Sequence, residues 1–198
     1  MGNYKVIHGW FTFDKLYSEI VTKFGTFEKK NYIPKPATFV EIGSWMGKSS
    51  CFMAENIKAY APHIKFYCVD IWTGSPHKPE QQAIVQKHGG SIYKCFLHNM
   101  ADAGVLDYVV PLQLSSLDAV SLFKEKSLDF VFVDGDHRAG ACLADMNAWW
   151  PKLKSGGVLA GHDIDLIEVY EDVVKFINKN TIAGIQWLHD QNCWRIDK

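Results

Sequence analysis

The sequence predicts an α/β fold in which helices cover both faces of a mainly parallel sheet. Short and almost continuous apolar runs recur along the chain, as at 37–43, 64–70 and 128–134, and such runs are typical of parallel strands buried on both faces. Segments with apolar residues at helical spacing lie between them, which indicates alternating strands and helices. Several of the runs end in an acid, at the edge where open α/β sheets bind their ligands.

Composition narrows the class of protein. The 198 residues, 47% hydrophobic and 22% charged, suit one globular domain without internal repeats. The net charge of −1 leaves no basic face, so we expect no nucleic-acid partner. Five separated cysteines form no C-x-x-C pair, which favours reduced thiols. With no signal-like N-terminus and no membrane-spanning run, the expected location is cytoplasmic.

The first elements are predicted from the spacing of apolar residues and from the glycine and proline residues that end helices and strands. Residues 13–24 carry apolar side chains at helical spacing, and Gly25 is the expected end of that helix. The stretch 26–36 is expected to be a loop. A buried strand at 37–43 and a helix at 47–61 follow.

The middle of the chain is less regular. A strand at 64–70 ends in an acid, and the following insert, 73–105, should contain a loop at 74–82 and then two helices. Residues 107–114 resemble a strand, but Pro111 cannot donate a ladder hydrogen bond and therefore favours a short or edge strand.

The C-terminal half repeats the strand and helix alternation. A helix at 115–124, with Ser115 or Ser116 as its N-cap, precedes the strand 128–134. A helix within 139–153, closed before Pro151, is followed by a strand at 156–163.

The chain should end in a helix and a hairpin. Asp165 is a candidate cap for a helix at 166–178, and 181–196 is typical of an antiparallel hairpin. The whole is then a Rossmann-like three-layer sandwich with a seven-stranded sheet. We expect 1–36 to be a helical extension or lid and 37–198 the main domain.

The loop after the first strand looks at first like a phosphate-binding P-loop. However, Gly43 and Gly47 are one residue too close for that motif, and Trp45 occupies the middle glycine of the dinucleotide fingerprint. What remains is the pattern acid-x-Gly-x-x-x-Gly after a strand, with Glu41 as the acid. Either the loop backbone approaches a ligand, or glycine serves only the turn.

Asp70 ends the next strand. In nucleotide-binding α/β proteins, an acid at this place accepts hydrogen bonds from ribose hydroxyls. The alternative is an acid that only caps a helix or a loop. Ile71 and Trp72 follow directly and are candidates to pack on an adenine ring.

These motifs carry a resemblance. Glu41-Ile42-Gly43 with Gly47, then Asp70, and above all the pairing of "LDFVFVDGDH" with "GGVLAGHD", resemble class I S-adenosylmethionine-dependent methyltransferases. The branch is the one with macrolide-sugar O-methyltransferases and cephalosporin-hydroxylase-like proteins. The resemblance implies that the glycine loop holds the methionine part of the cofactor, that Asp70 binds the ribose, and that residues 115–117 lie near the adenine. The implied cofactor contacts are Glu41, Gly43, Ser44, Trp45, Gly47, Ser49, Asp70, Ile71, Trp72, Ser115, Ser116, Leu117 and Asp134.

The resemblance also implies catalytic and metal-binding roles. Relatives bind magnesium with an acid at the position of Asp134 and an acid pair, or Asp-Asn, at the position of His162-Asp163. Because a histidine stands here, the site either lacks a metal or prefers manganese or iron to Mg²⁺. His137, three residues after Asp134, takes the place of the relatives' base. Asp136 could instead only cap a helix near 138, and His162 only orient a carboxylate.

The function implied is methyl transfer to a hydroxyl of a small molecule or sugar, with the segments 8–36 and 73–105 as a lid. Two alternatives stay open. One is a metal-dependent glycosyltransferase, since Asp134-Gly135-Asp136 imitates a D-x-D motif. The other is a cofactor-binding module without chemistry. A homo-oligomer is compatible with the sequence, which says nothing more about assembly.

Overall fold

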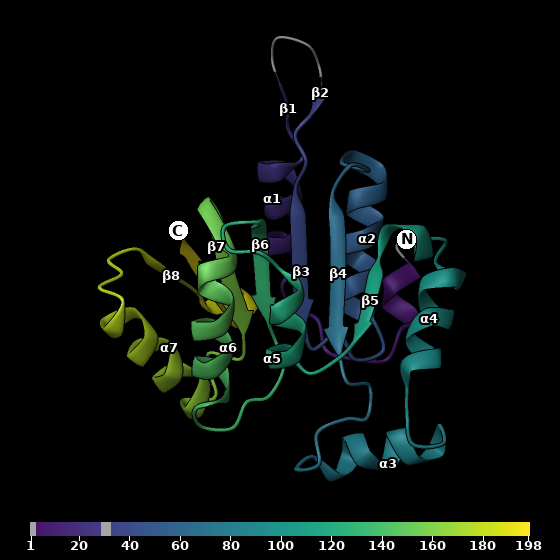
Figure 1. Cartoon of the computed structure of the whole chain (residues 1–198). Coiled ribbons are helices and arrows are strands. Elements are labelled where there is room, and N and C mark those ends of the chain that lie inside the picture. Colours follow the sequence, from purple (N-terminus) through teal and green to yellow (C-terminus); the bar gives the residue numbers. More distant parts are fainter. Residues whose placement is uncertain (1–2, 29–32) are drawn as a thin grey trace.

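The computed structural model describes residues 3–28 and 33–198. Its centre is a seven-stranded sheet in the order β5-β4-β3-β6-β7-β9-β8 (Figure 1). The strands β5, β4, β3, β6 and β7 pair in parallel with one another, whereas β9 pairs antiparallel with both β7 and β8. The strands are β3 (Thr38–Ile42), β4 (Lys65–Asp70), β5 (Val110–Gln113), β6 (Leu128–Val133), β7 (Leu153–His162), β8 (Ile185–Leu188) and β9 (Cys193–Asp197). The expected fold class and its C-terminal hairpin are confirmed.

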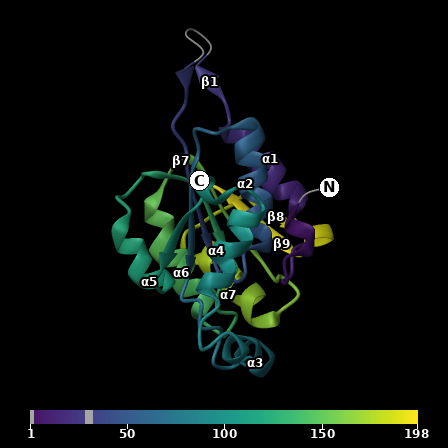
Figure 2. The same cartoon turned by 90° about the vertical axis from the view of Figure 1, so that its right-hand side faces the viewer.

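Helices form the two outer layers (Figure 2). The helices are α1 (Asp14–Phe24), α2 (Lys48–Tyr60), α3 (Pro79–Lys87), α4 (Tyr93–Asp102), α5 (Ser116–Ala119), α6 (Ala141–Trp149) and α7 (Ile167–Lys179). Buried side chains of α1, α2 and α4 share one core with the sheet, and those of α6 and α7 share the other. No helix among the described residues is long and apolar enough to cross a membrane.

The strand sequences explain the two cores. Successive strand residues face opposite sides of a sheet. Accordingly, Phe130 and Phe132 belong to the core beneath α1 and α2, while Val131 and Val133 belong to the core beneath α6 and α7. All of β6 is buried. Each of its valine, leucine and phenylalanine side chains contributes about 1.5–3 kcal/mol to folding when fully buried.

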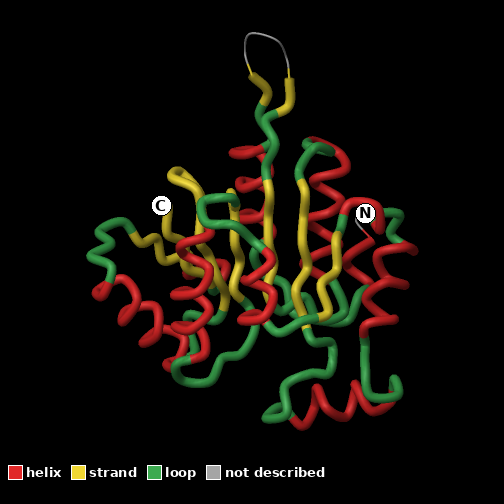
Figure 3. The backbone as a smooth tube through the Cα atoms, in the orientation of Figure 1, coloured by secondary structure: helices red, strands yellow, loops and turns green. Residues whose placement is uncertain are grey.

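The topology gives the sheet two unlike ends. The parallel strands point the same way, so the carboxyl ends of β3, β4, β6 and β7 meet at one edge, and α3 lies beyond that edge (Figures 1 and 3). A short antiparallel ribbon of β1 (Phe27–Glu28) and β2 (Ile33–Pro34) lies at the opposite end. The stretch expected as a loop at 26–36 therefore carries paired strands, although 29–32 lie outside the described residues.

Other element boundaries also differ from expectation. α3 begins at Pro79 within the expected loop, because proline is well suited to the first turn of a helix. Pro111 does lie on an edge strand, β5, as predicted. α6 ends at Trp149, before Pro151 as predicted, and Pro151 lies in a 3-10 helix that follows it, η4 (Trp150–Lys152).

The structure forms neither the helix cap considered as an alternative for Asp136 nor the cap expected at Asp165. α6 begins at Ala141 rather than near 138, and the Asp136 carboxylate accepts a hydrogen bond from the Arg138 amide instead of capping the helix. Leu166, not Asp165, is the N-cap residue of α7. The carboxylate of Asp165 is held elsewhere, since it accepts a hydrogen bond of 2.7 Å from the Asn192 side chain.

Candidate active site

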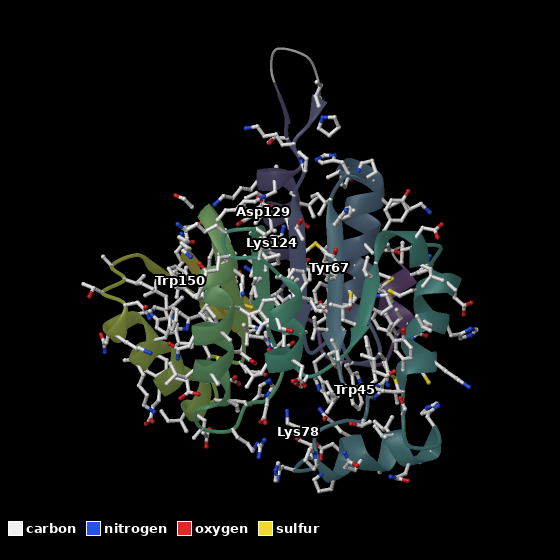
Figure 4. The ribbon with its side chains drawn as sticks, viewed as in Figure 1. Trp45, Tyr67, Lys78, Lys124, Asp129 and Trp150 are labelled. Carbon is white, nitrogen blue, oxygen red and sulfur yellow. The ribbon has the colours of Figure 1, made fainter. Side chains whose placement is uncertain are left out.

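A cavity of about 410 Å³ lies over the carboxyl ends of β3, β6 and β7. Figure 4 shows Trp45 and Lys78 at this end of the sheet, next to α3. Segments far apart in the sequence line it: Gly9, Trp10 and Thr12 before α1, the loop after β3, Lys78 and Glu80 at the start of α3, and the ends of β6 and β7. From the predicted site it contains Gly43, Ser44, Trp45, Ser49, Asp134, His137, His162 and Asp163.

The glycine loop is shaped by the neighbouring strand. Gly43 has φ +89°, and a Cβ built there would lie 1.9 Å from the Asp134 carbonyl oxygen. Its amide donates to Val69 on the other side, at 2.8 Å. Only glycine fits at this crossing, so the motif reflects backbone contact between β3 and β6. Gly47 also has φ +89° and packs against Met100.

Glu41 lies behind the loop rather than in the cavity. Its carboxylate is 1% exposed and accepts hydrogen bonds from Tyr17 Oη at 2.9 Å, Ser44 Oγ at 2.8 Å and Ser50 Oγ. Burial raises the pKa of Glu41, against the lowering effect of these hydroxyls. The network fixes the loop from below, so contact of Glu41 with a cofactor stays a prediction.

Asp70 joins the two loops beside the cavity. Its carboxylate oxygens accept the amide of Trp45 at 2.8 Å and the amide of Trp72 at 2.6 Å. Burial raises the pKa of Asp70, while the backbone N–H groups act to lower it. The indole of Trp72 is fully buried against Tyr93 and Phe96. It is therefore a core residue and offers no free face to a base, unlike Ile71, which is 43% exposed.

The adenine segment expected at 115–117 forms the start of α5. Ser115 is the N-cap, since its hydroxyl accepts the amide of Asp118. Ser116 donates to Asp145 at 2.5 Å and accepts from the Trp149 indole at 2.8 Å. These bonds make Ser116 a link between α5 and α6, and leave Leu117 exposed.

Three predicted metal ligands converge. One ligand atom each from Asp134, His162 and Asp163 lies within 4.8 Å of the others. The convergence follows from the parallel register of Val133 with Gly161, which sets the residues after β6 beside the end of β7. Asp163 has φ +63°, an unusual conformation for a non-glycine residue and one that concentrates at functional sites.

Electrostatics within this trio are strongly coupled. His162 Nδ1 lies 3.0 Å from Asp163 Oδ1. Burial acts to lower the pKa of His162, but the hydrogen bond to Asp163 and the negative charge of Asp134 outweigh it and raise that pKa. Burial acts likewise to raise the pKa of Asp163, but the hydrogen bond and charge of His162 hold it below the usual range.

His137 lies between the two acids and a lysine. Its Nε2 is 3.4 Å from Asp134 Oδ1 and 3.2 Å from Asp163 Oδ2, and its Nδ1 is 3.1 Å from Lys78 Nζ. An ammonium group can only donate, so Nδ1 accepts, and the proton of the neutral ring is on Nε2. Sequence reasoning missed Lys78, because nothing local distinguishes it among the lysines of the insert.

The segment before α1 reaches the same cavity. Thr12 Oγ1 is 2.8 Å from His162 Nε2 and 2.9 Å from the Gln191 carbonyl oxygen. Lys48 Nζ, at the start of α2, donates a hydrogen bond to the Gly9 carbonyl at 3.0 Å and so ties this segment to the glycine loop. Thr12 was also missed by sequence reasoning, since a single threonine before a helix gives no signal of a partner 150 residues away.

Residues 40–164 match the family described as a methyltransferase domain. The chain belongs to this methyltransferase family. The matched span runs from β3 to just beyond β7 and contains Glu41, Asp70, Asp134 and Asp163. The chain therefore carries a methyltransferase domain, and this match favours the methyltransferase interpretation over the glycosyltransferase alternative.

One relative matches in sequence, and solved methyltransferase structures share the fold. A protein of Sinorhizobium fredii, named uncharacterized protein y4gI, is 26% identical over 135 residues, which cover 68% of this chain but 14% of that relative's length. The O-methyltransferase NovP superposes with a TM-score of 0.69 at 15% identity, over 93% of this chain and 77% of its own. A methyltransferase from Geobacter sulfurreducens superposes with a TM-score of 0.62 at 12% identity, over 93% of this chain and 77% of its own.

Proposed function

We propose that this methyltransferase transfers the methyl group of S-adenosylmethionine to a hydroxyl of a small molecule, with a sugar or polyol as the acceptor class. The observation that carries the proposal is the convergence of Asp134, His137, His162 and Asp163 on one cavity beside the glycine loop. The resemblance of the fold to NovP, an O-methyltransferase, supports oxygen as the accepting atom.

In this proposal the cofactor lies along the loops after β3 and β4. The backbone amides and serine hydroxyls of the loop 43–49 bind the amino-acid end of the cofactor. The carboxylate of Asp70 accepts hydrogen bonds from the ribose hydroxyls. Ile71 and residues 115–117 lie toward the adenine. A loop without a phosphate-binding geometry suits this ligand, which has a sulfonium and an amino-acid end but no phosphate.

His137 is the proposed base. Methyl transfer needs in-line alignment and exclusion of water, which a cavity closed by segment 73–92 and by residues 9–12 would supply. The acceptor hydroxyl would take the place of Lys78 at His137 Nδ1 and pass its proton there. Such proton transfer contributes roughly 10²–10⁴ in rate.

The trio of Asp134, His162 and Asp163 is the proposed metal site. Two carboxylates and one imidazole fit Mn²⁺ or Fe²⁺ better than Mg²⁺, which prefers an all-oxygen set. When bound, such a cation lowers the pKa of the acceptor hydroxyl and fixes its angle.

The cavity walls support the acceptor class. Trp10 is 63% exposed at the cavity and offers an aromatic face. Gln81, Glu80 and Asn192 surround the same space with planar polar groups. An aromatic face with planar hydrogen-bonding groups is well suited to a sugar ring, whose faces are apolar and whose rim is polar.

The first test is ligand-induced thermal stabilisation. S-adenosylmethionine or S-adenosylhomocysteine at 100 times its dissociation constant should add about 2.7 kcal/mol, or about 5–11 °C for a domain of this size. The shift should vanish in Asp70→Ala and persist in Asp190→Ala, an exposed acid paired with Lys15. ATP with Mg²⁺ and a uridine diphosphate sugar with Mn²⁺ are the negative controls. A shift from either control ligand alone would refute the proposed cofactor site.

The second test addresses chemistry. His137→Ala should keep the thermal shift with S-adenosylmethionine and lower turnover of the true acceptor by about 10²–10⁴. His98→Ala, on the exposed side of α4, is the matched control. Turnover by His137→Ala close to that of the wild type would remove the base role. Tight cofactor binding without turnover of any acceptor would instead support a binding module without chemistry.

A further inference from the structure

The hydrogen-bond chain behind His162 has a defined direction. Thr12 Oγ1 carries one proton, and it lies 2.9 Å from the Gln191 carbonyl oxygen, which can only accept. The hydroxyl therefore donates to Gln191 and offers a lone pair to His162 Nε2, 2.8 Å away. It follows that Nε2 of His162 carries a proton.

This tautomer leaves the other ring nitrogen as an acceptor. In a neutral imidazole with its proton on Nε2, Nδ1 has a free lone pair. That atom lies 3.0 Å from Asp163 Oδ1, so two lone pairs would face one another. The arrangement is favourable in two cases only: a cation lies between the groups, or the ring carries a second proton and pairs with Asp163 as an imidazolium.

The hydrogen-bond chain is partly buried, and two of its members, Thr12 and Gln191, come from outside the family match. His162 is 9% exposed and Gln191 6% exposed. The ring of Phe13 lies 5.0 Å from that of His162, and Gln191 Oε1 accepts the Leu16 amide at 2.8 Å. Thr12 and Gln191 both lie outside the matched span, 40–164. The N-terminal segment and the C-terminal hairpin thus act together on one imidazole.

We infer that Thr12 is a positioning residue that fixes the His162 tautomer and so makes Nδ1 a ligand, with Asp134 and Asp163, for a divalent transition metal. The inference rests on the proposed function, in which these three residues form the metal site. It adds the cause of metal preference: imidazole nitrogen favours Mn²⁺, Fe²⁺ or Co²⁺ over Mg²⁺. A partner that orients a ligating histidine in this way is worth about 10–100-fold in metal affinity.

The test measures the binding of Mn²⁺ and Mg²⁺ to the whole chain without cofactor by calorimetry. Binding of Mn²⁺ is also followed by the loss of the electron paramagnetic resonance signal of the free ion. Wild type should bind Mn²⁺ at least about tenfold more tightly than Mg²⁺. Thr12→Val, which keeps the shape and loses the hydroxyl, should lower Mn²⁺ affinity by about 10–100-fold. Thr12→Ser should restore it. Thr22→Val is the matched control, since Thr22 also donates to a backbone carbonyl but lies on α1 away from the site.

A second variant keeps the test decisive if Thr12→Val is unstable. His162→Asn sets an amide oxygen on the same Cγ that carries Nδ1, so the ligand set becomes all oxygen. Its metal preference should shift toward Mg²⁺. An unchanged preference for Mn²⁺ in this variant would overturn the inference.

Two other results would also overturn it. One is Thr12→Val with the Mn²⁺ affinity of wild type. The other is wild type that binds neither ion, which would mean that His162 pairs with Asp163 as an imidazolium. The adenosyl-ligand thermal shift, measured on the same samples, separates this failure from that of the proposed function, because it does not depend on the metal.

Discussion

At the scale of single residues, Gly43 shows how a sequence motif can reflect contact between strands. We expect Gly43→Ala to destabilise the fold by more than about 4 kcal/mol, which is exceptional for one substitution, because the new Cβ would meet the Asp134 carbonyl at 1.9 Å. Gly140→Ala is the control: its φ is similar, at +84°, but no atom lies within 4 Å. It should cost only about 1–2 kcal/mol. Urea unfolding measures both, and equal losses would contradict the explanation.

Asp145 should give the stability a specific pH dependence. Burial raises the pKa of this carboxyl from 3.8 to about 6, although the Ser116 hydroxyl acts to lower it. Between those values the folded state binds more protons than the unfolded state, so stability falls as pH rises. The fall should reach roughly 3 kcal/mol by pH 7, since one pKa unit corresponds to about 1.4 kcal/mol.

The measurement is the free energy of unfolding from pH 4 to pH 7 in wild type and Asp145→Asn. The amide is neutral throughout, so the variant should lack the decrease between pH 4 and 6. Asp107→Asn, at an exposed acid of a 3-10 helix, should behave like wild type. Parallel curves for wild type and Asp145→Asn would mean that the carboxyl is ionised at low cost in the fold.

At the scale of elements, the segment containing α3 is expected to be held over the cavity by few contacts. Lys78 Nζ to His137 Nδ1 is one of them, at 3.1 Å. Lys78→Met should therefore raise the rate of thermolysin cleavage within 75–90 by roughly 10- to 150-fold, since a hydrogen bond to a charged group contributes about 1.5–3 kcal/mol. The melting temperature should stay the same. Lys87→Met, on the exposed end of α3, is the control, and equal cleavage rates in the two variants would refute the role of Lys78.

The element scale also shows how far patterns reach. Apolar runs predicted the five parallel strands and the hairpin, because a strand buried on both faces leaves a continuous signal. Boundaries were less predictable. The cap expected at Asp165 is absent because its carboxylate accepts a hydrogen bond from Asn192, and a partner so far along the sequence leaves no local signal. The alternative role of Asp136 as a cap is not realised either, since its carboxylate accepts the Arg138 amide.

At the scale of the whole molecule, the cysteines report on burial. Cys95 is partly exposed, and the other four thiols are buried. Burial raises the pKa of Cys51 to about 12, and also raises the pKa of the thiols of Cys68, Cys142 and Cys193. A thiol reagent should therefore react quickly with one thiol in the native protein and with five in denaturant. Cys95→Ser should abolish the fast reaction, and a second fast thiol in native protein would show that one of the helical layers opens.

The sequence by itself determined the fold class and the place of three acidic and imidazole side chains at the sheet edge. Apolar runs placed Asp134 and His162-Asp163 at strand ends, and parallel strands bring such ends to one edge, so the trio could be predicted before any coordinates. Only the tertiary structure decided which side chains from other segments contact the histidines of the site. Thr12 and Lys78 reach the site from segments without a motif, because such contacts depend on how helices and hairpin pack. The same packing buries Trp72 in the core, since an apolar side chain next to a strand end has no local signal that separates a wall of the cavity from the interior.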